Sequence, residues 1–351
     1  MNQRILVVKL ADLGDLLLCE PAIRSLRAAN PDAQIDILVP PETASLAMLL
    51  GHGLCPLVFE KKRFDRAQDL AQSENLRAMA SLWRTLRQRQ YDAIILLHHL
   101  TTVAGTRKFR ALALAARAPV VAGLDNGRGT FLTHRADDFG FGARHECEYM
   151  LSVSMSAGGT AVHPAPAFPV ESCEHGPPLP ERFAAIHPVT GPYSQARTWP
   201  IERWADVARG IARAGLVPVV VGAPDATGAA RAIVAREPAA IDITGSTTIP
   251  QLAGVLRRAA CVLGGDSFVG HLAAAVGTPT ASVFGPSNAD AWRPYGSRER
   301  HRVVMSQLPC QPCIYTGFSL GRPMGCPDRT CLRWVTVDDV LARLPLVAGA
   351  D

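Results

Sequence analysis

The sequence predicts an α/β protein with two doubly wound, Rossmann-like domains that face a cleft. Three observations support this prediction. The chain has 351 residues, whereas a single hydrophobic core stops growing at about 250–300 residues. Short buried strands alternate with segments of helical periodicity in both halves, which is typical of parallel sheets. Six prolines fall between Gly158 and Pro180 and separate the two halves.

The first half, residues 1–165, is predicted to be one such domain. Its first strand, Ile5–Leu10, is followed by a helix over Leu16–Ala29 and a second strand over Gln34–Val39. These three elements form a βαβ unit, which implies parallel strands joined by a right-handed crossover. The same alternation predicts strands at Ala93–Leu97 and Val120–Gly123, an Arg-rich helix ending at Gln88 and a helix near Thr106–Ala116.

A Pro-rich linker is predicted at residues 166–180, a second doubly wound domain at 181–335 and a C-terminal helix at 336–351. The strands of the second domain are expected at Phe183–His187, Val217–Gly222, Ile241–Thr244, Cys261–Gly264 and Thr280–Phe284, and its helices at Ile201–Ala214, Ala229–Arg236, Ile249–Arg258 and up to Ala275. Ligands bind beyond the carboxyl ends of the strands in such sheets. The loops after these strands are therefore the candidate sites.

The composition is that of an ordinary globular protein, with 48% hydrophobic and 19% charged residues. We expect a cytoplasmic protein, because the N-terminal apolar run is flanked by charges and lacks a small-residue cleavage site. The longest charge-free stretch, Ser267–Ala289, is broken by glycines and prolines, so no membrane span is expected. Basic and aromatic residues do not interleave in the pattern that stacks bases, so nucleic acid is not an expected partner.

The formal charge of +5 is concentrated between Lys61 and Arg89, a segment that opens with Lys61, Lys62 and Arg63. Such a run is most often a solvated helix face. The alternatives are contact with an anionic substrate or with an anionic membrane surface.

The stretch KLADLGDLLL, Lys9–Leu18, interrupts two apolar runs with Asp12, Gly14 and Asp15. It forms the turn between the first strand and its helix, at the carboxyl edge of the sheet. Gly14 is expected to allow an unusual backbone dihedral or the close approach of a ligand. Asp15 is either a helix cap, worth about 1 kcal/mol, or an ionised carboxylate that accepts a proton from a bound hydroxyl.

The corresponding turn of the second domain is Gly264-Gly265-Asp266-Ser267. The free amides of the helix that follows suit a diphosphate, although Asp and Ser are also routine helix caps. His271 on this helix is either a core histidine or a site residue. Arg197, in the loop after a predicted strand, either pairs with an acid or binds phosphate oxygens through its guanidinium. The opening turn does not match the dinucleotide fingerprint and the chain has no phosphate-binding loop motif, which disfavours a dehydrogenase or a kinase.

Taken in order, the segments KLADLGDLLLCEPAIRSLRAANPDAQI, RTWPIERW, GAPD, GGDSFVGHLAAAVGTP, FGPS and PCQPC resemble glycosyltransferase family 9, the ADP-heptose-dependent heptosyltransferases. The resemblance spans nearly the whole chain. It implies the two-domain glycosyltransferase B architecture, with an acceptor-binding N-terminal domain and a nucleotide-sugar-binding C-terminal domain. It also implies inverting transfer of heptose from ADP-heptose to a sugar of the lipopolysaccharide inner core, and contact with the inner face of the inner membrane.

The same resemblance implies roles for single residues. Asp15 lies where the family has its general base, and Arg197 lies where a basic residue contacts the donor diphosphate. The donor-binding set implied is Thr190, Arg197, Asp225, Gly265, Asp266, Ser267 and His271, and the acceptor-binding set is Gly14, Lys61, Lys62 and Arg63. The chain has no D-x-D triplet, so no cofactor is expected to be required for catalysis.

Two positions depart from the family pattern. Phe268 replaces a glycine beside the expected phosphates, which could alter donor fit. Ala226 replaces the glutamate expected to hold the ribose, and Asp225 is the candidate substitute one residue earlier.

Four cysteines, Cys310, Cys313, Cys326 and Cys331, are spaced C-x2-C-x12-C-x4-C in a Gly- and Pro-rich segment. Four thiolates from one loop would close a tetrahedral structural site for zinc or iron. The alternative is a loop of packed, reduced cysteines.

Two other functions stay open on the sequence alone. One is transfer to a protein hydroxyl, as in heptosyltransferases that modify autotransporters, which the cysteine cluster keeps open. The other is a sugar-nucleotide-binding scaffold without activity, in view of Phe268 and Ala226. The presence of Asp15 argues against the scaffold.

Overall fold

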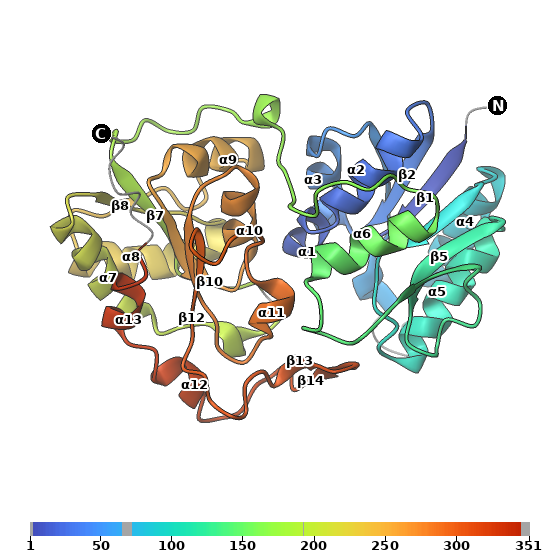
Figure 1. Ribbon diagram of the computed structural model, residues 1–351. Coiled ribbons are helices and arrows are strands. Elements are labelled where there is room, and N and C mark those ends of the chain that lie inside the picture. Colours follow the sequence, from blue (N-terminus) through green and yellow to red (C-terminus); the bar gives the residue numbers. More distant parts are fainter. Residues whose placement is uncertain (1–2, 65–71, 192, 345–351) are drawn as a thin grey trace. The chain divides into compact units, whose positions relative to one another are not determined.

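The computed structural model describes residues 3–64, 72–191 and 193–344, and its helices and strands carry the labels of Figure 1. The chain divides into two compact units. Unit 1 comprises Met1–Gly140 and Glu146–Pro164, and unit 2 comprises Phe141–His145 and Ala165–Asp351. The chain therefore contributes five residues to unit 2 before it returns to complete unit 1.

Unit 1 is built on a parallel six-stranded sheet with the order β3-β2-β1-β4-β5-β6. The strands are β1 Arg4–Val8, β2 Gln34–Val39, β3 Leu54–Val58, β4 Ala93–Leu96, β5 Val120–Asp125 and β6 His134–Asp137. The helices are α1 Leu13–Leu17, α2 Glu20–Ala29, η1 Pro41–Thr43, α3 Ala44–Leu49, η2 Lys61–Phe64, α4 Ser73–Gln88, α5 Val103–Ala116 and α6 Glu146–Ser156. The strand order changes direction between β1 and β4, and ligands bind at such a switch point.

The helix expected over Leu16–Ala29 is divided in the structure. Helix α1 begins earlier, at Leu13, and ends at Leu17, and α2 starts at Glu20 with Pro21 in its first turn. Proline lacks the N–H that would bond the carbonyl four residues before it, so it is tolerated at the start of a helix and not inside one. Pro21 therefore accounts for the break.

Unit 2 contains a second parallel six-stranded sheet, with the order β12-β11-β10-β7-β8-β9. Its strands are β7 Phe183–His187, β8 Val217–Val220, β9 Ile241–Asp242, β10 Val262–Gly265, β11 Thr280–Val283 and β12 His301–Val304. Its helices are η4 Val170–Ser172, η5 Gln195–Arg197, α7 Ile201–Arg213, η6 Pro224–Ala226, α8 Thr227–Arg236, α9 Ile249–Arg258, α10 Phe268–Ala275, α11 Ala289–Trp292, α12 Thr330–Arg333 and α13 Val337–Leu341. Here the switch point lies between β7 and β10.

Each sheet is buried because helices cover both of its faces, as parallel strands require. All of Ile5–Val8 in β1 are at most 1% exposed. In unit 2, Trp199 and Trp204 pack edge to face with their ring centroids 4.9 Å apart, and both are buried. These cores fix the strand ends from which the candidate site residues project.

A short antiparallel hairpin, β13 Ile314–Thr316 and β14 Ser319–Gly321, also belongs to unit 2. The amide of Phe141 donates a hydrogen bond to the carbonyl of Gly317 at 2.8 Å. The Asn288 side chain donates to the carbonyls of Phe141 and Tyr315 at 3.2 and 3.0 Å. These bonds hold residues 141–145 against the hairpin.

Across the described ranges, the helices are too short or too polar for any of them to cross a membrane. In the predicted linker, residues 166–180, the structure contains the one-turn helix η4. From the predicted C-terminal helix it describes α13, and residues 345–351 lie outside the described part.

Candidate functional site

The first group of candidate residues follows β1 at the switch point of unit 1. Asp12 is the N-cap of α1, and Asp15 lies in the first turn of that helix. The Asp15 side chain is 32% exposed, and its Oδ1 lies 3.9 Å from Nζ of Lys9. Asp12 stands at the N-cap position of α1 but its side chain makes no cap hydrogen bond, and the Asp15 carboxylate is partly open to solvent at the carboxyl edge of the sheet.

Lys9 is a buried residue that the sequence reasoning missed. Its side chain is 5% exposed, and Nζ donates a hydrogen bond to the carbonyl of Leu97 at 3.1 Å, at the end of the neighbouring strand β4. Burial lowers the pKa of Lys9, but Cys19, Asp15 and Glu146 together raise it above its ordinary value. The ammonium is therefore charged, and a lysine at the end of a buried strand was the signal that could have revealed it.

A buried ion-pair cluster lies close to this turn. His99 contacts Asp138 through Nδ1 and Glu146 through Nε2, each at 3.0 Å, and its side chain is 6% exposed. Burial lowers the His99 pKa, but Glu146 and Asp138 outweigh it and raise the pKa to about 9. Both ring nitrogens face carboxylates, so both carry protons and the ring is an imidazolium.

The backbone conformation of Gly14 differs from the one expected. Gly14 lies inside α1, its carbonyl accepts the amide of Leu18 at 3.0 Å, and its backbone is helical. The expectation of an unusual dihedral at Gly14 was therefore wrong, because the helix begins before the glycine rather than after it.

The three basic residues expected to bind the acceptor have different surroundings. Nζ of Lys61 donates to the carbonyl of Leu10 at 3.3 Å, which brings it to the β1 turn. The Arg63 guanidinium pairs with Glu60 and, at 3.7 Å, with Glu74. The side chain of Lys62 lies outside the described part of the structure.

The second group follows β10 at the switch point of unit 2. Nη1 of Arg197 donates to Oδ2 of Asp266 at 2.9 Å and to the Asp266 carbonyl at 3.2 Å. The two side chains are 12% and 7% exposed, so this ion pair is almost completely buried. The structure thus shows Arg197 paired with an acid, which lies at the start of the candidate donor helix, and phosphate binding by Arg197 stays a prediction.

Neighbouring residues close the same cluster. Oγ1 of Thr190 contacts Oγ1 of Thr198 at 2.9 Å, and Thr190 packs so closely on Gly265 that a Cβ there would lie 3.1 Å from its methyl group. Ser267, the N-cap of α10, shares a hydrogen bond of 3.0 Å with Nδ1 of His187. Burial lowers the His187 pKa to about 4, so that its ring is neutral.

A narrow gap between side chains, too small to hold a water molecule, is lined by Gly265, Asp266, Ser267, His271, Ser282, Phe284, Trp292 and Pro294. Thr190, Arg197, Gly265, Asp266, Ser267 and His271 therefore lie together in unit 2. Asp225 is exposed in η6, after β8, and does not line this gap. Trp292 is a lining residue that the sequence reasoning missed, although it lies only five residues after the FGPS segment.

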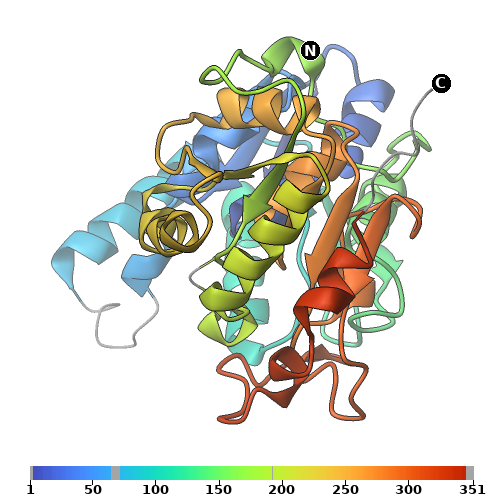
Figure 2. The same ribbon diagram turned by 90° about the vertical axis from the view of Figure 1, so that its left-hand side faces the viewer.

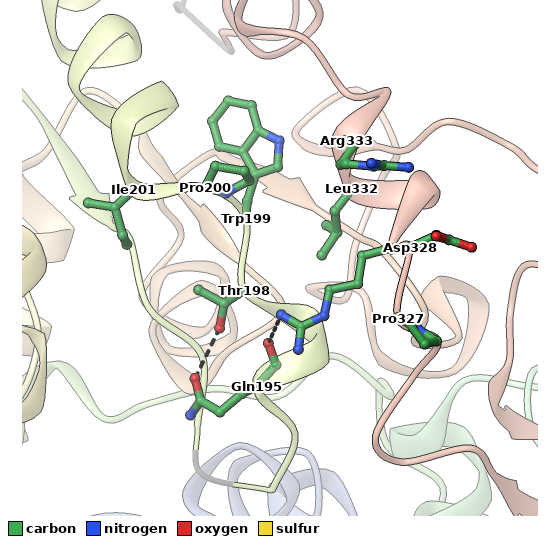
Figure 3. Close-up of a pocket in the computed structure, with 10 residues that line it drawn as sticks. Gln195, Thr198, Trp199, Pro200, Ile201, Pro327, Asp328, Leu332 and Arg333 are labelled. Carbon is green, nitrogen blue, oxygen red and sulfur yellow. Dashed lines mark hydrogen bonds between the residues drawn. The ribbon is translucent and has the colours of Figure 1, made fainter.

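A larger cavity of about 550 Å³ lies between residues 195–201 and residues 327–333 (Figure 3). It is lined by Gln195, Thr198, Trp199, Pro200, Ile201, Pro327, Asp328, Arg329, Leu332 and Arg333. Arg329 donates to the carbonyl of Gln195 at 3.4 Å, and Thr198 donates to the Gln195 side chain at 3.3 Å. None of the predicted donor residues lines this cavity, so its size does not mark the predicted site.

The four clustered cysteines are free thiols. Burial is the first cause that raises the pKa of Cys313 and of Cys331, and the neighbouring thiols add to it, so the four lie within electrostatic range of one another. Within residues 3–64, 72–191 and 193–344, however, no group of three or more His, Cys, Asp or Glu side chains has the arrangement of a metal site. The thiols as placed here do not fit a tetrahedral metal ion.

Two parallel sheets in a Rossmann strand order, each with charged residues at its switch point, are the two-domain α/β architecture that the sequence predicted. Residues 79–321 match the model of glycosyltransferase family 9 (heptosyltransferase), and the chain belongs to this family. It is therefore a glycosyltransferase, as the sequence predicted.

Individual relatives agree with this assignment. The chain is 26% identical over 341 residues to lipopolysaccharide heptosyltransferase 1 of Pseudomonas aeruginosa, which covers 89% of this chain and 86% of the relative. Its fold is similar to that of ADP-heptose lps heptosyltransferase II of Escherichia coli, with a TM-score of 0.68, 19% identity and 97% of each chain covered. It is also similar to the dodecameric iron-containing heptosyltransferase TibC, of Escherichia coli, with a TM-score of 0.60, 14% identity, 98% of this chain and 76% of TibC.

Proposed function

We propose that this protein transfers heptose from ADP-heptose to a hydroxyl of an inner-core lipopolysaccharide sugar, with inversion at the anomeric carbon. The N-terminal domain, residues 1–165, would bind the acceptor, and residues 181–335 would bind the donor. The observation that carries the proposal is the buried Arg197–Asp266 pair beside the start of α10, with Asp15 exposed in the other unit. The names of the relatives support the choice of donor and acceptor.

The donor diphosphate is expected at the start of α10. Its free amides and the positive end of its dipole attract an anion. Asp266 already holds the Arg197 guanidinium in place. Arg197 would therefore lose little side-chain freedom when its remaining N–H groups bind the diphosphate. As ADP departs, its charge would be shared by Arg197 and these amides, and such preorganised donors stabilise a developing anion.

The acceptor hydroxyl must lose a proton as it attacks the anomeric carbon. Asp15 would accept this proton, because its carboxylate is exposed and is not used as the helix cap. Nζ of Lys9, 3.9 Å from Oδ1 of Asp15, would hold the carboxylate in place. The new bond forms between the acceptor oxygen and the anomeric carbon while the bond to ADP breaks, which inverts the configuration.

The remaining predicted residues have narrower parts in the proposal. His271 and Ser267, which line the gap beside Asp266, would contact the donor phosphate and sugar, and Thr190 packs against Gly265. Asp225, exposed after β8, would contact the ribose in place of the glutamate that Ala226 replaces. Lys61, beside the β1 turn, is the best placed of the basic residues for an acidic acceptor, since Arg63 is paired with Glu60 and Glu74.

Catalysis by this mechanism requires no cofactor, because Asp15 supplies the base and Arg197 with the amides supplies the positive charge. A structural zinc or iron at Cys310, Cys313, Cys326 and Cys331 is a separate proposal, supported by the electrostatic coupling of these thiols and by the description of TibC as iron-containing. It requires the cysteine loop to adopt a tighter arrangement. Elemental analysis of the purified protein tests it, and a content far below one equivalent of zinc or iron would reject it.

The decisive assay for the function measures ADP release from ADP-heptose with either a core oligosaccharide or an autotransporter-type peptide as acceptor. Transfer to the oligosaccharide, with an inverted linkage seen by NMR, is the expected result. Transfer only to the peptide would favour the protein-modifying alternative. Tight ADP-heptose binding without release with either acceptor would favour the scaffold.

A further inference from the structure

Four aromatic rings of unit 2 pack against one another in a continuous stack. The ring centroids of Trp292 and Tyr315 lie 4.1 Å apart, and the ring of Phe141 packs against both of them at 5.2 and 5.3 Å. The ring of Tyr193 is almost parallel to that of Tyr315, with the centroids 5.7 Å apart and an angle of 11° between the planes. We call these four residues the aromatic stack. Tyr193, which is 38% exposed, is its most exposed member.

The aromatic stack is assembled from segments at the carboxyl edge of the unit 2 sheet. Tyr193 belongs to the loop after β7, and Trp292 belongs to α11, which follows β11. The hairpin that carries Tyr315 is fixed to the turn after β11, because the amide of Ile314 donates to the carbonyl of Pro286 at 2.9 Å. The hairpin, coloured orange-red, lies at one end of unit 2 in both views (Figure 1 and Figure 2). Ligands of parallel sheets bind at this edge.

The aromatic stack borders the candidate donor site. Trp292 lines the narrow gap that Asp266 also lines. Tyr193 precedes Ser194, whose carbonyl accepts a hydrogen bond from Nε of Arg197 at 3.4 Å. The loop that places the guanidinium proposed for the donor diphosphate therefore also places the exposed ring of the stack.

The strand order indicates which part of a bound ADP-heptose would lie near the aromatic stack. The diphosphate is proposed at the start of α10, after β10, and the ribose beside Asp225, after β8. Because the sheet runs β11-β10-β7-β8, the nucleoside would lie on the β8 side of the diphosphate and the heptose on the β11 side. Trp292 follows β11, so the stack lies on the sugar side.

The exposed end of the aromatic stack is suited to a sugar ring. Tyr315 lies against one face of the Tyr193 ring, so the exposure of Tyr193 is on its other face and its edges. A pyranose carries C–H groups on one face, and such groups pack on the electron-rich face of an aromatic ring. Small-molecule sites typically combine aromatic walls with a few polar groups, and the Arg197–Asp266 pair supplies polar groups close by.

We propose that the aromatic stack binds the apolar face of a sugar ring, with Tyr193 as the residue in contact. The inference rests on the proposed function, because it takes ADP-heptose as the donor and a core sugar as the acceptor. The transferred heptose and the acceptor sugar both carry such a face, and separate binding measurements distinguish them.

The first measurement compares the affinities of wild type and Tyr193→Ala for ADP and for ADP-heptose by calorimetry. The affinity for ADP should not change, because ADP lacks the heptose. If the heptose contacts the aromatic stack, the affinity for ADP-heptose should fall about tenfold, which corresponds to about 1.4 kcal/mol, within the range for one aromatic stacking contact. Tyr193→Phe keeps the ring and should keep the wild-type affinity.

The second measurement is the affinity for a core oligosaccharide in the presence of ADP. If the acceptor sugar contacts the aromatic stack, Tyr193→Ala should lower this affinity about tenfold and leave the affinity for ADP-heptose unchanged. Phe318→Ala is the matched control, because Phe318 is an exposed aromatic residue of the same hairpin, at 49% exposure, that lies outside the stack. Its three affinities should equal those of the wild type. Circular dichroism and the thermal midpoint confirm that the variants fold.

Unchanged affinities of Tyr193→Ala for both ADP-heptose and the oligosaccharide would overturn the proposal. So would an equal loss of affinity for ADP and ADP-heptose, because the stack would then act on the nucleotide or on the loop as a whole. A wild type that binds both ligands without transferring heptose would contradict the proposed function alone. The aromatic stack and the transferase activity therefore fail in different measurements.

Discussion

The two switch-point acids, Asp15 after β1 and Asp266 after β10, each follow a strand that borders the switch point of its sheet, but they have different surroundings. The Asp15 carboxylate is 32% exposed and has a lysine at 3.9 Å, whereas the Asp266 carboxylate is 7% exposed and is held by Arg197 at 2.9 Å. An exposed carboxylate can exchange a proton with a ligand, and a buried one in an ion pair cannot do so cheaply. This difference in exposure supports the proposal that Asp15 transfers a proton while Asp266 positions a charge.

The largest effect is expected from Asp15→Asn. The amide cannot accept the proton, so turnover should fall by about 10²–10⁴-fold, the usual contribution of a general base. ADP affinity, measured by calorimetry, should not change, because the donor residues lie in unit 2. Asp12→Asn is the matched control, because Asp12 is an exposed acid at the N-cap position of the same helix and its side chain makes no cap hydrogen bond, so its turnover should stay at the wild-type level.

Arg197→Ala should lower ADP affinity by roughly 10–100-fold, as expected for the loss of charge-assisted hydrogen bonds. It should also destabilise unit 2 by about 3–5 kcal/mol, because the buried Asp266 carboxylate loses its partner. Arg209→Ala is the control: Arg209 also pairs with an aspartate, Asp206, at 2.8 Å, but both side chains are largely exposed. Unchanged ADP affinity in Arg197→Ala would remove this residue from the donor site.

Each unit also contains a buried histidine, His99 in unit 1 and His187 in unit 2, that makes the free energy of unfolding depend on pH. The His99 pKa is raised to about 9, mainly by Glu146 and Asp138 against the effect of burial, so its contribution is complete below pH 6.5 and is lost as pH rises through 9. The His187 pKa is lowered to about 4 by burial, so stability falls as pH drops from 6.5 towards 4. The His99 contribution is at most about 3 kcal/mol.

Denaturant unfolding between pH 6 and 10 checks this prediction. The wild type should lose stability above pH 6.5, and His99→Gln should flatten that decline. A wild-type curve that stays level or rises over this range would contradict the assignment of an imidazolium at His99.

The smallest effect is expected from Thr248→Ala, which tests whether a loss of stability in unit 2 alone weakens ADP binding. Thr248 caps α9 and forms a reciprocal capping box with Gln251. Thr248→Ala should lower the free energy of unfolding by about 1 kcal/mol and leave ADP affinity unchanged. A loss of ADP affinity in this variant would mean that a loss of stability alone weakens donor binding. The lower affinity of Arg197→Ala would then no longer be evidence that Arg197 contacts the donor.

Regular patterns carried most of the fold prediction. The helix Ile249–Arg258 and the strand Phe183–His187 coincide with α9 and β7, because apolar runs with clear turn residues on both sides leave little choice. Strand β6, His134–Asp137, was missed since its sequence HRAD is polar, and it pairs only at the sheet edge. The break between α1 and α2 depends on Pro21, which the helical periodicity masks.

The candidate site was less accessible to sequence reasoning. The resemblance to the family indicated Asp15, Arg197 and Asp266, but a sequence cannot show that Arg197 and Asp266 pair with each other. That pairing follows from the adjacency of β7 and β10 at the switch point. The position of Lys9 at the end of a buried strand signals its burial, but the sequence does not show which carbonyl and which carboxylate it meets in the folded sheet.

The most direct test of the proton-transfer assignment is chemical rescue of Asp15→Ala. Its turnover is measured with saturating ADP-heptose and acceptor while sodium formate replaces sodium chloride at constant ionic strength. Formate should enter the space left by the carboxylate and raise turnover in proportion to its concentration. Wild-type turnover without formate, or no response to formate in a variant that binds ADP normally, would contradict the role assigned to Asp15.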